Sequence, residues 1–213
     1  VKGGAFLERA ASVRAVLFDK TGTLTEGRPV LAETVTLADQ SADRVLATAA
    51  ALEAYSNHPL ARAVVAAAEA RRGAGEGETA DTRGASGIPQ LVSIRELAGQ
   101  GVTGTIDGVE YAVGSPAMAR GRLALDDEAE ETLGDLEDRG LSVLVLLEGG
   151  ETDASAIALL GIADAVRPGA AVAVSALRAA GVEHTVMLTG DNPRVAARVA
   201  AETGVTDHRA RLL

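Results

Sequence analysis

Apolar runs near both ends of the chain have the spacing expected for a parallel sheet. Val13–Phe18 is mostly apolar and stops at Asp19, as a buried strand would. Helical spacing over Pro168–Ala180 and Pro193–Thr203 flanks a second strand predicted at His184–Leu188. Because alternating helices and strands are typical of parallel sheets, both ends are predicted to have α/β structure.

The middle of the chain has a different pattern. A Ser cap opens a helix predicted over Ser41–Ala54, and a second helix is predicted over His58–Arg71. Arg72–Gly87 is rich in Gly, Glu and Thr without periodicity, which predicts an exposed loop. The acidic segment Asp126–Arg139 has one apolar stripe and is therefore interpreted as a helix with a solvated face.

Five strands are also expected in this middle region. The first three form an antiparallel meander in which Asp107-Gly108 is a tight turn. The expected strands are Leu91–Leu97, Val102–Asp107, Val109–Val113, Ser142–Leu147 and Ala154–Ile162. We interpret the whole as one domain inserted into another: residues 1–27 and 164–213 form an α/β domain, and residues 28–163 form an α+β domain.

Composition narrows the classes of function. The net charge of −10 repels nucleic-acid phosphates and anionic lipids, so no nucleic-acid partner is expected. No apolar stretch approaches the roughly 20 residues of a membrane helix. The chain has no cysteine, and its three histidines lack metal-ligand spacing. With two Phe, two Tyr and no Trp, a ligand pocket would offer little aromatic stacking.

The segment Asp19-Lys20-Thr21-Gly22-Thr23-Leu24-Thr25 carries the clearest chemistry. An Asp at the carboxyl end of a parallel strand projects into the crevice where such sheets bind ligands. Gly22 allows the backbone to turn closely around a phosphate, and the threonines supply hydroxyl and amide groups. Such a carboxylate can attack the terminal phosphorus of a nucleotide and form an aspartyl phosphate. The alternative is a plain acidic turn at a strand end.

A second segment, Thr189-Gly190-Asp191-Asn192, also follows a predicted strand and precedes a helix that starts with Pro193. A phosphate near Thr189 and the Gly190 amide would meet a helix N-terminus, where the dipole and unpaired N–H groups favour anions.

The first segment matches the phosphorylation motif of P-type ATPases at all seven positions, and the chain resembles that family. The resemblance implies a haloacid-dehalogenase-like fold for the α/β domain, ATP as substrate, Asp19 as nucleophile and as a Mg²⁺ ligand, and a backbone oxygen of Thr21 as a second ligand. It also places Lys20, Thr189, Gly190 and Asp191 in the catalytic set, and Asp164-x-x-Arg167-Pro168 fits the same family.

A phosphatase of the same superfamily is an alternative. Such an enzyme normally carries a second acid two residues after the nucleophile, and Thr21 occupies that position here. Without this general acid/base an aspartyl phosphate should persist, which favours the ATPase.

The inserted domain resembles the heavy-metal subclass. Ser56-Asn57-His58-Pro59-Leu60 is similar to its Ser-x-His-Pro-Leu element, although most members carry Glu where this chain has Asn57. The resemblance implies that ATP contacts Glu53 and His58, and also Gly99, Gly101 and Gly104 of the segment Gly99-Gln100-Gly101-Val102-Thr103-Gly104. A dinucleotide-binding reading of these glycines is weak because they precede a strand rather than a helix.

Further motifs of this family are absent after Leu213, so we expect the chain to be a piece of a longer metal pump. The pump would lie in the cell membrane with this region on its cytoplasmic side, and its metal ion would bind outside this region. Gly114-Ser115 leans toward zinc, cadmium or cobalt over copper. Incomplete Mg²⁺ ligation would leave little turnover, so a nucleotide-binding module without catalysis is an alternative, and an unpaired sheet edge would favour self-association.

Overall fold

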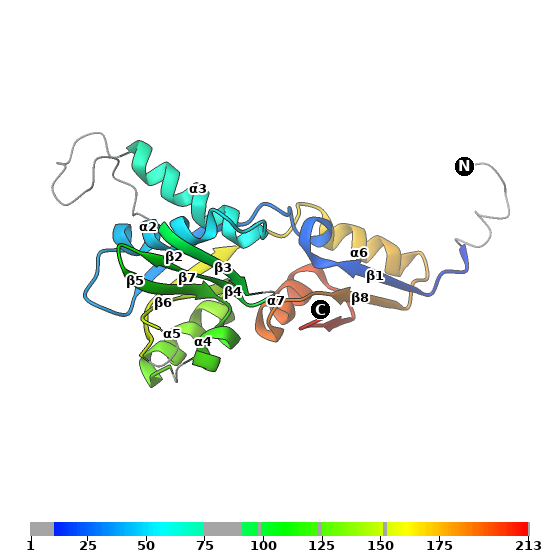
Figure 1. The fold of residues 1–213 in the computed structure, drawn as a ribbon. Helices are drawn as coiled ribbons and strands as arrows, with labels where there is room; N and C mark the ends of the chain where they lie inside the picture. The colour runs from blue at the N-terminus through cyan, green and yellow to red at the C-terminus, as the bar shows by residue number, and fades with distance from the viewer. Residues whose placement is uncertain (1–10, 75–90, 98, 123–124, 151–152, 213) are drawn as a thin grey trace. The chain divides into compact units, whose positions relative to one another are not determined.

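The structure is a computed structural model that describes residues 11–74, 91–97, 99–122, 125–150 and 153–212. Within these ranges the chain forms two compact units, each with its own sheet (Figure 1). The first unit comprises the described residues of Val1–Arg28, Asp138–Gly140 and Asp164–Leu213, and the second comprises those of Pro29–Glu137 and Leu141–Ala163.

The first unit contains a parallel sheet with the strand order β1-β8-β9. Its strands are β1 (Ala15–Asp19), β8 (His184–Leu188) and β9 (Asp207–Arg209), and its helices are α6 (Ala170–Ala179) and α7 (Pro193–Thr203). A small core forms where Val174 of α6 and Ala196 of α7 pack with Met187 of β8. The α/β organisation predicted for the chain ends is therefore confirmed, and β9 is an element that the sequence pattern did not indicate.

The second unit contains an antiparallel sheet with the strand order β2-β7-β6-β5-β4-β3. The predicted meander is confirmed, with Asp107 and Gly108 at φ of 51° and 84° in the turn between β4 and β5. The strands are β2 (Val30–Thr36), β3 (Leu91–Leu97), β4 (Gly101–Ile106), β5 (Val109–Gly114), β6 (Ser142–Glu148) and β7 (Ser155–Ala163). The sequence pattern did not predict β2.

Helices cover both faces of this sheet. One face packs on α2 (Ala42–Glu53) and α3 (Pro59–Ala74) through a cluster that includes Leu46, Val64 and Val113. The other face packs on α4 (Pro116–Arg122) and α5 (Asp127–Asp138) through a cluster that includes Leu133 and Val145. The inner strands β6 and β7 thus bury both of their sides.

The ends of the helices follow capping rules. The Ser41 hydroxyl accepts a hydrogen bond from the Arg44 amide at 3.3 Å, as the predicted cap requires. The helix α3 continues to Ala74, so the loop predicted from Arg72 is wrong for its first three residues. Basic side chains at this end complement the helix dipole, which favours the extension. The rest of the predicted loop lies outside the described residues.

Candidate functional site

Asp19 lies at the carboxyl end of β1, where its side chain is exposed. In the parallel ladder Asp19 lies beside Leu188, the last residue of β8, and Thr189 follows directly. The expectation that Asp19 and Thr189 lie at the same edge of adjacent parallel strands is therefore confirmed. This edge of an α/β sheet is where ligands characteristically bind.

The chain turns sharply after Asp19. The amide of Thr25 donates to the carbonyl oxygen of Lys20 at 3.0 Å and closes a wide turn. Gly22 has φ of 76°, a backbone conformation that residues other than glycine rarely adopt. Thr21 and Thr23 are exposed, whereas Thr25 is fully buried. The turn therefore presents two hydroxyl groups to solvent beside Asp19.

Lys20 joins this turn to the segment after β8. Its side chain is buried, and its ammonium group forms an ion pair with the carboxylate of Asp191. The Asp191 amide in turn donates to the Thr189 hydroxyl at 3.1 Å. Lys20 is thus directed toward Asp191 rather than toward solvent, which suits a positioning role for a residue that the resemblance placed in the catalytic set.

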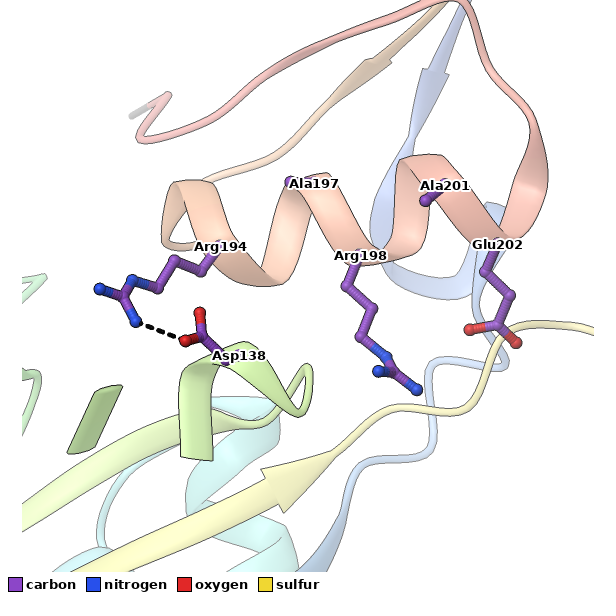
Figure 2. Close-up of a pocket in the computed structure, with 6 residues that line it drawn as sticks. All are labelled: Asp138, Arg194, Ala197, Arg198, Ala201 and Glu202. Carbon is purple, nitrogen blue, oxygen red and sulfur yellow. Dashed lines mark ion pairs between the residues drawn. The ribbon is translucent and has the colours of Figure 1, made fainter. Parts of the chain in front are cut away.

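The segment Thr189-Gly190-Asp191 precedes α7, and the start of that helix is well defined. The Asn192 side chain accepts from the Arg194 amide at 2.7 Å, and Pro193 occupies the first turn. One side of α7 packs in the core through Val195, Ala196, Val199 and Ala200. The opposite side is exposed and carries Arg194, Ala197, Arg198, Ala201 and Glu202 (Figure 2). Packing of the apolar side therefore orients the N-terminus of α7 beside the end of β8.

Two side chains from the segment that follows β7 hold the turn after Asp19. Asp164 accepts hydrogen bonds from the Thr25 hydroxyl at 2.6 Å and from the Gly27 amide at 3.1 Å. Arg167 donates to the carbonyl oxygens of Gly22 and Thr23 at 3.0 and 3.3 Å. The sequence shows the spacing of this acid and this base but did not predict their contacts, because their partners lie about 140 residues away in the chain.

The oxygen atoms near Asp19 suit magnesium. The Asp19 carboxylate and the backbone oxygen of Thr21 are hard ligands, and Mg²⁺ commonly uses one or two carboxylates with water and phosphate completing its shell. Within the described ranges, no group of three or more His, Cys, Asp or Glu side chains could hold a metal by itself. The residues therefore fit a Mg²⁺ ion that arrives with a phosphate ligand.

A second group of candidate residues lies in the other unit, around the end of α2. Glu53 is buried, and burial raises its pKa to about 7, with smaller effects from a hydrogen bond to Ser56, which lowers it, and from the Glu96 carboxylate, which raises it. The Ser56 hydroxyl also accepts from the His58 amide at 3.2 Å. Nδ1 of His58 accepts from the Leu60 amide at 3.2 Å, so the neutral ring carries its proton on Nε2. His58 thus caps α3 and has Nε2–H as its remaining donor.

The glycines expected to line the same pocket have different structural reasons. Gly99 has φ of 69° in the turn before β4, with open space where a side chain would extend. Gly101 faces β5, and a Cβ there would lie 2.2 Å from the carbonyl oxygen of Val113. Gly114 is equally tight, since its Cβ would lie 2.3 Å from the carbonyl oxygen of Gln100. Close strand pairing therefore requires glycine at positions 101 and 114, whereas the turn alone requires it at 99.

Gly104 lies apart from the other two glycines. It is buried in the middle of β4, where its ladder partners are Ile94 and Tyr111. It lines a cavity of about 350 Å³ whose described lining includes none of Glu53, His58, Gly99 and Gly101. The sequence pattern grouped Gly104 with the turn, and only strand pairing reveals this separation.

Ser115 also has a local role. Its hydroxyl accepts from the Met118 amide at 3.2 Å and caps α4. The preference for zinc, cadmium or cobalt was inferred from Gly114-Ser115. Both of these residues have structural roles in the fold. No helix in the described parts of the chain is both long and apolar enough to cross a bilayer.

Comparison with known proteins identifies the family. A haloacid dehalogenase-like hydrolase model matches residues 13–212. The manganese-exporting P-type ATPase of Mycobacterium tuberculosis is 37% identical over 215 residues, which cover 100% of this chain and 28% of that protein. Copper-exporting P-type ATPase B of Archaeoglobus fulgidus is 38% identical over 206 residues, or 97% of this chain and 27% of that protein.

A solved structure agrees with these relatives. A zinc-transporting PIB-type ATPase in its E2.Pi state is 33% identical with a TM-score of 0.65, over 100% of this chain and 31% of the other. The chain thus spans less than a third of the length of these proteins. The chain belongs to the haloacid dehalogenase-like hydrolase family, and its relatives over its whole length are heavy-metal P-type ATPases.

Proposed function

We propose that this chain is the ATP-binding and aspartyl-phosphorylation region of a heavy-metal-exporting P-type ATPase. The observation that supports this most is the meeting of Asp19 and the Thr189-Gly190-Asp191 segment at one edge of a parallel sheet, joined by the Lys20–Asp191 ion pair. In the complete protein the region would lie on the cytoplasmic side of the cell membrane and drive export of a metal ion bound elsewhere.

In the proposed reaction an Asp19 carboxylate oxygen attacks the γ-phosphorus of ATP, and the bond from that phosphorus to the β-phosphate oxygen breaks as ADP leaves. Thr189 and the Gly190 amide would contact phosphate oxygens near the N-terminus of α7. Asp19 and Thr21 would hold Mg²⁺, which supplies neutralising charge when bound. Asp164 and Arg167 keep the turn in place through four hydrogen bonds.

The residue two positions after Asp19 weighs against the phosphatase alternative. The side chain two residues after Asp19 is Thr21, which offers no carboxyl group to activate water. The proposal is tested by expressing the full-length protein in membranes with labelled ATP and transportable metal ions. An acid-stable phosphoenzyme should form, and Asp19→Asn should abolish it. Nucleotide binding with no phosphoenzyme under any metal would favour the non-catalytic module.

Nucleotide recognition is proposed for the Glu53, His58 and Gly99–Gly101 region, with ATP or ADP as ligand. A lost hydrogen bond to a buried group costs about 1 to 3 kcal/mol, so His58→Ala should weaken ATP binding by roughly 5- to 150-fold in calorimetric titration. Asp19→Asn should barely change it. Because His58 also caps α3, His58→Asn is the matched control: it keeps a capping acceptor but lacks the Nε2 donor. Full ATP affinity in both variants would contradict the assignment.

We also propose that the chain self-associates through β1. In the described residues β1 pairs only with β8, so its other edge has no strand partner, and the neighbouring side chain of Leu17 is 62% exposed. Unpaired apolar edges tend to pair with other chains. Sedimentation should show concentration-dependent dimers that Leu17→Lys reduces, whereas the same substitution at the exposed Val172 of α6 should not.

A further inference from the structure

A cavity of about 350 Å³ opens on the sheet of the second unit, and neither the phosphorylation motif nor the end of α2 contributes to its described lining. Two of the residues that line it, Thr103 and Thr105, come from β4. Val102 and Ile106 of the same strand pack in the cluster with α2, so alternation directs Thr103 and Thr105 to the other face. The two threonine side chains therefore lie on the face of the sheet that packs on α4 and α5.

Charged side chains from neighbouring elements line the same cavity. Arg95 of β3 is the ladder partner of Thr103, and Glu110 of β5 is the ladder partner of Thr105. Side chains of ladder partners lie on the same face of a sheet, so Arg95 and Glu110 share the face of the two threonines. Arg122, the last residue of α4, also lines the cavity. Three strands and one helix thus bring two guanidinium groups and one carboxylate to one place.

These three charged groups are not paired with one another. Within the described residues, Arg95, Arg122 and Glu110 take part in no ion pair. The neighbouring Arg120 differs, because its guanidinium donates to the Glu130 carboxylate at 2.6 and 2.7 Å. Both planar guanidinium forks of the cavity can therefore bind an oxyanion, and the carboxylate can accept from a cation.

The hydroxyl groups of the cavity favour a phosphate as the oxyanion. The Thr105 hydroxyl accepts from the Ser93 hydroxyl at 3.1 Å, so the hydrogen of Thr105 remains for a ligand. A phosphate monoester has three terminal oxygens around one centre and can accept from two forks and a hydroxyl at once, whereas a carboxylate has only two coplanar oxygens. The volume is at the lower end of the range for ligand pockets, which limits the ligand to a small molecule.

Glu110 determines what accompanies the phosphate. Its carboxylate lies beside the turn between β6 and β7, where a Cβ at Gly150 would be 2.6 Å from Oε2. A second anionic group would be repelled there, whereas an ammonium group would be attracted. We propose that this cavity binds a small phosphate monoester that also carries an amino group, with Arg95, Arg122 and the Thr105 hydroxyl on the phosphate and Glu110 on the amino group.

The experiment is an NMR titration of this chain with phosphoethanolamine, followed through the amide signals of β4 and β5. Ethyl phosphate lacks the amino group and ethanolamine lacks the phosphate, so the two separate the contributions. We expect saturable shifts in β4 and β5, with binding about threefold weaker for ethyl phosphate and about tenfold weaker for ethanolamine. Glycerophosphoethanolamine, a diester like a lipid headgroup, should also bind about tenfold more weakly, because it has one terminal oxygen fewer.

Substitutions assign the contacts. Arg95→Gln and Arg122→Gln should each weaken phosphoethanolamine binding by about tenfold, because each removes charge-assisted hydrogen bonds to the phosphate. Arg72→Gln is the matched control: it removes an exposed arginine of the same unit from α3, which packs on the other face of the sheet, and should keep the wild-type affinity. Glu110→Gln should abolish the preference for phosphoethanolamine over ethyl phosphate.

The position of the shifts decides between this cavity and the other sites of the chain. Shifts confined to the segments around Asp19 and Thr189 would place the phosphate at the candidate phosphorylation site and overturn the proposal. Unchanged affinity in both Arg95→Gln and Arg122→Gln, or an equal loss in Arg72→Gln, would also overturn it. Equal binding of the diester would show that the cavity does not recognise a monoester.

Discussion

The two units of the chain differ in how completely they enclose their sheets. In the second unit helices pack on both faces of the sheet, and buried side chains form a cluster on each face. In the first unit three strands share one small cluster, and Leu17 of β1 points its side chain into solvent. Asp19, the proposed nucleophile, is exposed in the first unit, whereas Glu53 is buried in the second. The difference in enclosure thus leaves Asp19 exposed to solvent and raises the pKa of Glu53.

The largest effect is expected at the ion pair between Lys20 and Asp191, which lies in the first unit and has a buried lysine. Lys20→Met leaves the Asp191 carboxylate without its cation and should destabilise the first unit by about 3 kcal/mol, the lower end for a broken buried pair because Asp191 is partly exposed. Amide exchange in β1 and β8 measures this. The double variant Lys20→Met/Asp191→Asn should recover much of the loss, and unchanged exchange in Lys20→Met would show that the pair does not hold the two segments together.

The free energy of unfolding of the second unit should depend on pH because Glu53 is buried there. The folded-state pKa of Glu53, about 7, lies above its ordinary value of 4.5, so its contribution to stability is fully present below pH 4.5 and is lost as pH rises through 7. Relative to Glu53→Gln, the wild type should lose about 3 kcal/mol across this window. Urea denaturation of both proteins at several pH values measures the difference. A constant difference from pH 4.5 to 7 would mean that Glu53 is solvated.

Within the second unit, substitution of two neighbouring glycines by alanine should cost different amounts of stability. Gly101→Ala places a Cβ against the backbone of β5 and should cost about 2 kcal/mol or more, since β5 must move. Gly99→Ala meets no atom within 4 Å and should cost only about 1 kcal/mol, for its positive φ. Thermal unfolding compares the two variants. Equal losses would indicate that strand packing is not the reason for glycine at 101.

The smallest effects concern helix caps, one in each unit. Ser41→Ala removes the cap of α2 and Asn192→Ala removes that of α7, and each should lower the free energy of unfolding of its own unit by about 1 kcal/mol. Amide exchange followed residue by residue measures both. Threonine at either position should restore most of the cap. An equal loss of protection in both units from one substitution would argue against treating them separately.

The sequence by itself predicted much of the secondary structure. The bounds of β3, β8 and α7 agree with the structure residue for residue, because each has clear periodicity and clear end signals such as Pro193 and Gly204. The strand β2 was missed since Glu33 and Thr34 interrupt its alternation, with a register shift between Leu31 and Glu33. The short strand β9 has no apolar run at all.

The sequence also placed Asp19 and Thr189 at strand ends, because a local motif and a local strand suffice for that. Only the tertiary structure decided which side chains hold them: the Lys20–Asp191 pair and the contacts of Asp164 and Arg167 join segments far apart in the chain. The same holds for Glu53, whose raised pKa depends on burial and on Glu96 from another element. Local chemistry can be predicted from neighbours in the sequence, whereas burial and long-range pairing depend on how the whole chain packs.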